Sequence, residues 1–109
     1  MMIQRNTISL AALCGLLVAG GAWAVGESVS QKGKIFAPDE MSRTVGETVH
    51  IDNDDGVPHN IHVTAPDGDG RNLGLQMPGS HTAISIEKVG DYMVRCGIHP
   101  KMKLVVHAR

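Results

Sequence analysis

The chain has 109 residues with 10 basic and 11 acidic side chains, a formal net charge of −1 with histidine neutral. This length allows one small domain. The near balance of charge gives no indication of the basic face that nucleic-acid binding needs. Aromatic residues make up only 3% of the chain, so the core has to come from aliphatic side chains and methionine.

The N-terminal residues have the pattern of an export signal. Arg5 supplies a positive start, an apolar run follows over 8–18, and Ala22-Trp23-Ala24 is a small-x-small cleavage site. The apolar run is short for a membrane span. We therefore expect a signal peptide over 1–24, a mature domain over 25–109 and a periplasmic location, with a retained N-terminal anchor as the alternative.

Short alternating segments separated by Gly, Pro and Asp turns predict strands. The expected strands are 34–37, 41–45, 48–52, 59–64, 83–87, 92–96 and 103–107. Residues 25–31 are expected to form a loose lead-in, and 66–80 a long loop with at most a short strand near 73–75. No window after residue 24 keeps a helical period, so the pattern indicates an all-β, antiparallel sandwich.

The segment 59–64 also predicts which side chains face inward. If Ile61 and Val63 are buried, His59 shares their side, whereas Asn60 and His62 lie on the other.

The segment 96–102 holds three potential metal ligands within seven residues. Cys96, His99 and Met102 lie at i, i+3 and i+6, and His59 can supply a second imidazole. Two His, one Cys and a weakly bound Met are the ligands of a blue-copper electron-transfer site, because sulfur favours Cu(I) and imidazole serves both oxidation states. Zinc fits less well, since structural zinc sites rarely use a thioether. For Met102 the alternative is packing in the core.

Cys96 is the one cysteine of the expected mature chain, so no internal disulfide can form there. A lone thiol in an exported protein favours a dedicated chemical role. Of the other histidines, His50, His62, His81 and His107 are expected at the surface. His62 is the best candidate among them for a second, weaker metal site.

The chain resembles the cupredoxins of the amicyanin, pseudoazurin and plastocyanin-like type. The matching motifs are 45–49 (VGETV), 58–62 (PHNIH), 90–92 (GDY) and 96–102 (CGIHPKM). The resemblance implies a small Greek-key β-sandwich of about seven to eight strands. It also implies that His59, Cys96 and His99 form a trigonal copper set, that Met102 is the long axial ligand, and that Asn60 ties the two ligand loops together.

In such proteins redox partners dock on an apolar patch around the second histidine ligand. The resemblance therefore implies a docking patch around His99. Lys101 and Lys103 lie close by in sequence and favour a partner whose contact surface has an acidic rim. Gly97-Ile98 departs from the usual Thr-Pro pair of amicyanin-like loops, and Arg95 places a charge beside the site. The expected patch residues are Val57, Pro58, Met77, Pro78, Ile98 and Pro100.

These features predict a monomeric, non-enzymatic, one-electron carrier with one Cu(I)/Cu(II) ion. Its partner would be a transiently bound dehydrogenase or c-type cytochrome. Copper tolerance or delivery is the alternative, although the chain has no Met- or His-rich tract. A copper oxidase or reductase is disfavoured because the chain has no His-x-His pair for a catalytic copper.

Overall fold

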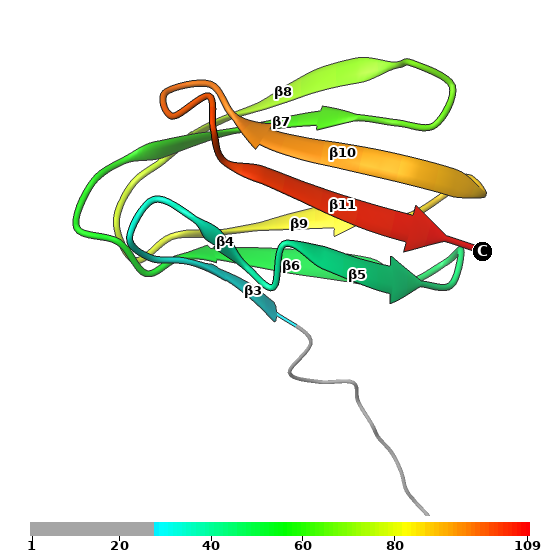
Figure 1. The fold of residues 1–109 in the computed structure, drawn as a ribbon, viewed down its shortest axis with the longest axis horizontal. Helices are drawn as coiled ribbons and strands as arrows, with labels where there is room; N and C mark the ends of the chain where they lie inside the picture. Colours follow the sequence, from blue (N-terminus) through cyan, green and yellow to red (C-terminus); the bar gives the residue numbers. More distant parts are fainter. Residues whose placement is uncertain (1–27) are drawn as a thin grey trace, which may run out of the picture.

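The computed structural model describes residues 28–109, which contain nine strands and no helix (Figure 1). The described chain therefore has no helix long and apolar enough to cross a membrane. The expected signal peptide, 1–24, lies outside the described residues. The strands are β3 Ser28–Gln31, β4 Phe36–Ala37, β5 Glu40–Arg43, β6 Thr48–Asn53, β7 His59–Thr64, β8 Gly70–Gln76, β9 His81–Ser85, β10 Gly90–Cys96 and β11 Lys103–Ala108.

The strands form two sheets that pack as a sandwich. One sheet has the order β5-β11-β10-β7-β8 and the other has the order β4-β3-β6-β9. Two pairings, β5 with β11 and β3 with β6, are parallel, and the others are antiparallel. The predicted all-β sandwich is confirmed, but its sheets are mixed rather than purely antiparallel, because the chain moves between the sheets before it returns beside an earlier strand.

Two sequence expectations about strands were wrong. The expected lead-in contains β3, whose Val29 and Gln31 are fully buried. The expected loop over 66–80 contains β8, which pairs with β7 along its length through one irregularity near Ile61 and His62. Both strands depend on pairing with partners elsewhere in the chain rather than on their own apolar pattern.

Alternating strand residues build the core between the sheets. In β7 the buried positions are His59, Ile61 and Val63, as the sequence predicts. Each aliphatic side chain of this kind contributes about 1.5–3 kcal/mol relative to an exposed one. The other buried apolar residues are Val29, Phe36, Val49, Ile51, Ile84, Ile86, Tyr92, Val94, Cys96, Met102, Leu104, Val106 and Ala108.

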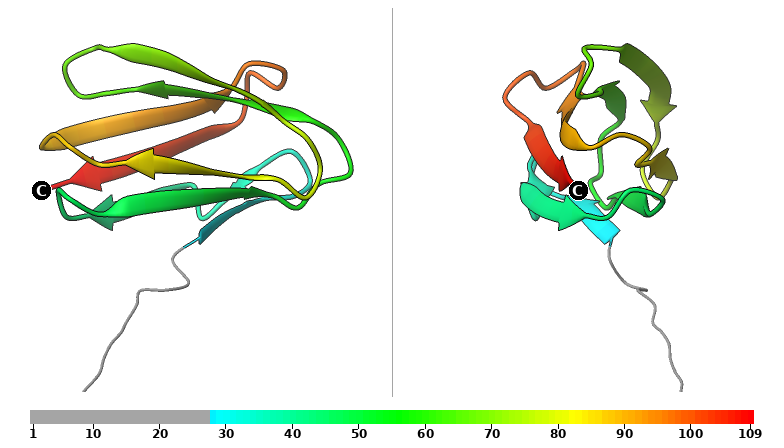
Figure 2. Two further views of the ribbon diagram at one scale, coloured as in Figure 1. Left: turned by 180° about the vertical axis from the view of Figure 1, so that it is seen from behind. Right: turned by 90° about the vertical axis from the view of Figure 1, so that its right-hand side faces the viewer.

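The loops gather at the two ends of the sandwich (Figures 1 and 2). Because β7 and β10 are antiparallel with Cys96 opposite Ile61, the start of β7 and the end of β10 lie at the same end. The loop from β10 to β11 closes that end, at the left of Figure 1, whereas the C-terminus lies at the opposite end. The sheet thereby places His59 beside the 96–102 segment. We call this the metal end of the molecule.

Candidate metal centre

Three donor side chains converge at the metal end. His59 begins β7, Cys96 ends β10, and His99 lies in the loop that follows. Their ligand atoms all lie within 4.8 Å of one another. The Nδ1 atoms of the two imidazoles are 3.1 Å apart, and the Cys96 Sγ lies 3.5 Å from Nδ1 of His59 and 3.7 Å from Nδ1 of His99.

These separations fit one metal ion. Bonds of about 2.0 Å to nitrogen and about 2.3 Å to sulfur, at near-tetrahedral angles, separate two nitrogens by about 3.3 Å and a nitrogen from the sulfur by about 3.5 Å. His59 and Cys96 are buried, and His99 is half-buried. A thiolate with two imidazoles is the donor set that suits copper in both oxidation states.

The Cys96 sulfur has a backbone hydrogen-bond donor. The N–H of Asn60 lies 3.3 Å from Cys96 Sγ, and the N–H of Gly97 donates to the Asn60 carbonyl at 2.9 Å. A donor to a thiolate ligand stabilises its negative charge and tunes the metal it binds. The main chain of Asn60 therefore joins the start of β7 to the end of β10.

Met102 closes the ligand loop. Its side chain is 3% exposed, and its N–H donates to the carbonyl of His99 at 3.0 Å. This bond makes 99–102 a tight turn that returns the chain into β11. A thioether held there is within the same loop as two of the three clustered donors.

Asp55 orients His59 through the ring nitrogen that points away from Cys96. The sequence pattern did not indicate this role for Asp55. Its Oδ2 lies 2.9 Å from His59 Nε2, the ring nitrogen that does not face Cys96. The backbone N–H groups of Lys34 and Gly33 donate to the same carboxylate at 2.9 and 3.0 Å. These two bonds, helped by His59, lower the pKa of Asp55 from 3.8 to about 2. The only signal in the sequence was an acidic residue four positions before a candidate ligand.

A buried polar network lies next to His59, and it was not predicted from the sequence either. Gln76 pairs with His59 across β7 and β8, and its amide donates to the carbonyl of Ile51 at 2.8 Å. Gln31 donates to Gln76 Oε1, and Asn53 donates to the Gln76 carbonyl at 2.9 Å. The network joins the two sheets at the metal end, and Gln31 Oε1 is buried without a hydrogen-bond partner among the described residues.

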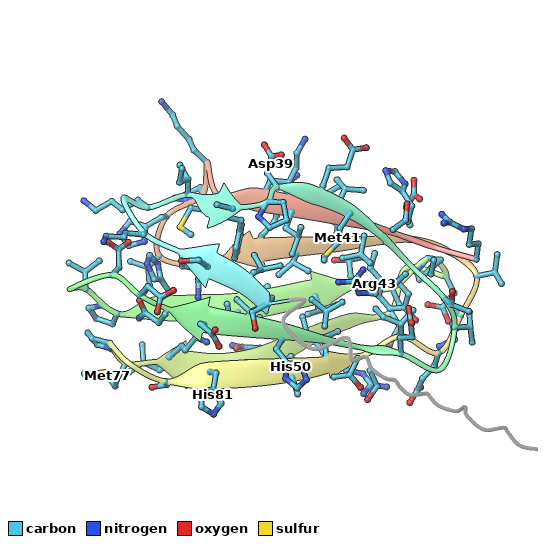
Figure 3. The ribbon with its side chains drawn as sticks, turned by 90° about the horizontal axis from the view of Figure 1, so that it is seen from below. Asp39, Met41, Arg43, His50, Met77 and His81 are labelled. Carbon is cyan, nitrogen blue, oxygen red and sulfur yellow. The ribbon has the colours of Figure 1, made fainter. Side chains whose placement is uncertain are left out.

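The expected docking patch comes from three loops at the metal end. Met77 is 53% exposed and Ile98 is 46% exposed, and Figure 3 shows Met77 projecting at that end. Pro58, Pro78 and Pro100 are exposed, whereas Val57 is half-buried. Most of the expected patch residues are therefore accessible to solvent at the metal end, where His99 is half-buried.

The remaining histidines are not part of the cluster of three donors. His50 and His81 project from the outer face of the four-stranded sheet (Figure 3). His62 is exposed and lies against Gly97: a Cβ added to Gly97 would be 2.9 Å from His62 Nε2. His107 is half-exposed and hydrogen-bonds to Glu40 and Asp91.

Solved structures with this fold are cupredoxins. A purple cupredoxin from Nitrosopumilus maritimus matches with a TM-score of 0.66 and 25% identity over 75% of this chain and 98% of that one. Amicyanin from Paracoccus versutus matches with a TM-score of 0.70 and 24% identity over 81% of this chain and 85% of that one. The chain therefore has the cupredoxin fold, and its His-Cys-His donor set fits a type 1 copper site.

Two curated relatives carry the same name. The chain is 38% identical over 77 residues to the methylamine utilization protein MauL of Methylophilus methylotrophus, covering 67% of this chain and 44% of the relative. It is 30% identical over 64 residues to MauL of Methylorubrum extorquens, covering 59% and 56%. The chain thus spans about half the length of the curated relatives it matches. No protein-family model matches the chain.

Proposed function

We propose that this protein is a periplasmic one-electron carrier whose copper ion is bound by His59, Cys96 and His99, with Met102 as the long axial ligand. The observation that carries the proposal is the convergence of one thiol sulfur and two imidazole Nδ1 atoms within 4.8 Å. Copper supplies a reversible one-electron couple when bound. In this assignment residues 1–24 are a removable export signal and 25–109 form a monomeric copper domain.

The surroundings of the ligands support electron transfer rather than substrate chemistry. His59 and Cys96 are buried, Asp55 and Asn60 hold their positions through hydrogen bonds, and Met102 is buried at the end of the ligand loop. A fully ligated ion has no open position for a substrate, unlike the metal of a catalytic site. Rigid ligands also keep the geometry similar in both oxidation states. The protein is accordingly a carrier and not an enzyme.

The name of the MauL relatives supports a role in methylamine utilization. Oxidation of an amine releases electrons that a diffusible protein can carry to an acceptor. We place this carrier between a dehydrogenase and a c-type cytochrome, with both partners binding transiently at the exposed patch around His99. Copper tolerance or delivery is less well supported, because the described donors form one enclosed site.

The test is the visible spectrum of the mature protein, residues 25–109, loaded with Cu(II). We expect an intense sulfur-to-copper charge-transfer band that disappears on reduction and in Cys96→Ala. Met102→Leu should keep the band but shift the reduction potential, because an axial ligand tunes the potential of such sites.

A weak absorption that Cys96→Ala leaves unchanged would overturn the type 1 copper assignment and favour copper handling. A strong band combined with rapid loss of Cu(I) to a soluble chelator would instead favour copper delivery. Retention of copper together with fast electron exchange supports the carrier.

A further inference from the structure

A transverse row of basic and imidazole side chains crosses the outer face of the five-stranded sheet next to Cys96. Arg95 pairs with Lys103 on one side and with His62 on the other. Residue alternation places all three on the outer face, and all three are exposed. Neighbouring strands are about 4.8 Å apart, so the three side chains lie side by side over β11, β10 and β7.

The cations of this row have no acidic partner. Arg95, Lys103 and the nearby Lys101 make no ion pair within residues 28–109. Like charges on adjacent positions of a sheet are unfavourable, so this arrangement costs stability. A positive cluster that the fold itself leaves unneutralised is available for charges on another molecule.

The opposite end of the same face carries carboxylates that already have a hydrogen-bond partner. Asp91 and Glu40 flank His107, which hydrogen-bonds to them at 2.7 and 2.5 Å. The cations that have no acidic partner within residues 28–109 therefore lie at the metal end of this face, and the carboxylates Asp91 and Glu40 at the far end are already partnered by His107. These cations would steer an approaching acidic protein toward the metal end before contact.

We propose that the row Lys103, Arg95 and His62 is a second docking surface, distinct from the apolar patch around His99, that receives the acidic face of a redox protein. The proposal rests on the electron-carrier function above. Arg95 directly precedes Cys96 in β10, so a partner seated on the row is one residue along the backbone from the copper thiolate. The sequence had indicated only Lys101 and Lys103, as a rim of the apolar patch.

The experiment is stopped-flow electron transfer from the reduced, copper-loaded protein to two oxidised c-type cytochromes, one with an acidic and one with a basic surface around its haem edge. The variant is Arg95→Gln/Lys103→Gln. The control is Arg71→Gln/Lys88→Gln, which removes the same charge from exposed residues that pair with Asp69 and Asp67 away from the metal end.

At low ionic strength we expect Arg95→Gln/Lys103→Gln to slow the reaction with the acidic cytochrome about tenfold, whereas the control stays within about twofold. The difference should vanish in about 0.5 M salt, where screening is nearly complete. Reduction potentials measured for both variants separate docking from a changed driving force.

Three outcomes would overturn the proposal. Equal slowing of electron transfer in the two variants would mean that only the net charge of the protein matters. If the wild-type protein reacted faster with the basic cytochrome than with the acidic one, the row would repel its partner. Binding to phosphatidylglycerol vesicles that the Arg95→Gln/Lys103→Gln variant loses would assign the row to a membrane surface. If the wild-type protein shows the copper band but exchanges electrons with neither cytochrome, the carrier function itself fails.

Discussion

Asp55 and His59 are joined through the ring nitrogen that faces away from the metal cluster: Asp55 Oδ2 lies 2.9 Å from His59 Nε2, while Nδ1 faces Cys96 Sγ at 3.5 Å. A proton held on Nε2 leaves the Nδ1 lone pair available to a metal. Because Gly33 and Lys34 hold the same carboxylate, the orientation of this ligand depends on the loop between β3 and β4 of the other sheet.

Replacing Asp55 with Ala should weaken copper binding by about tenfold or more, which is the usual cost of losing the hydrogen-bond partner of a metal-binding histidine. Asp55→Asn keeps an acceptor oxygen, so its copper affinity should fall less than that of Asp55→Ala. Competition with a chromophoric chelator measures both affinities. Asp54→Ala is the control, since Asp54 bonds to Ser30 at the surface instead; an equal loss in that variant would show that local loop stability, not His59, is responsible.

Gly97→Ala should lower the free energy of unfolding by about 1 kcal/mol, because the added methyl group overpacks a filled site. Its Cβ would lie 2.9 Å from His62 Nε2 and 3.0 Å from Asn60 Oδ1. Adding His62→Ala should restore about half of the loss, as urea unfolding of the copper-free protein can measure. No recovery in the double variant would mean that Asn60 is the main obstacle.

Gln76→Leu should destabilise the protein by about 1–3 kcal/mol, because it leaves the buried carbonyl of Ile51 and the amide of Gln31 with fewer partners. Denaturant unfolding gives the change. The neighbouring exposed residue supplies the comparison: Met77→Leu should stay within about 0.5 kcal/mol of the wild type. A neutral Gln76→Leu would show that the polar network contributes no net stability.

His107 should stabilise the fold below neutral pH and lose that effect in alkali. Hydrogen bonds to Glu40 and then to Asp91 raise the pKa of His107 above its ordinary 6.5. A raised folded-state pKa means that the stabilisation is fully present below pH 6.5, where the carboxylates are still ionised down to about pH 5. It then disappears as the pH rises through the folded-state value.

Thermal unfolding of the wild type and His107→Gln should therefore differ most between pH 5 and 6.5, with the wild type more stable, and the two should converge as the pH rises through the raised pKa of His107. His50→Gln, at an exposed histidine outside this cluster, serves as the reference. A constant difference between wild type and His107→Gln across the whole range would assign the effect of His107 to packing.

Local pattern was sufficient to predict seven of the nine strands, but not β3 and β8, and it predicted the three donors that the fold then brought together. The alternation of Ile61 and Val63 placed His59 inward, and the spacing of Cys96 and His99 predicted one loop. The register of β7 against β10 completes the cluster, because it fixes Cys96 opposite Ile61.

Features that depend on distant parts of the chain were missed. Ser28–Gln31 is polar in sequence, and Gln31 is buried only because the amide of Gln76 from the other sheet meets it. Asp55 acts on His59 because the loop at Gly33 and Lys34 fixes its carboxylate. Polar side chains in such places give no periodic signal, since their burial is decided by partners and not by hydropathy.

The burial of Cys96 also protects its thiol from forming a disulfide with a second molecule. A thiol that is 2% exposed cannot reach the thiol of a second molecule, and disulfide exchange or alkylation requires that contact. The chain can therefore remain in air before it meets its metal without cross-linking to its copies, until the loop that carries His99 opens.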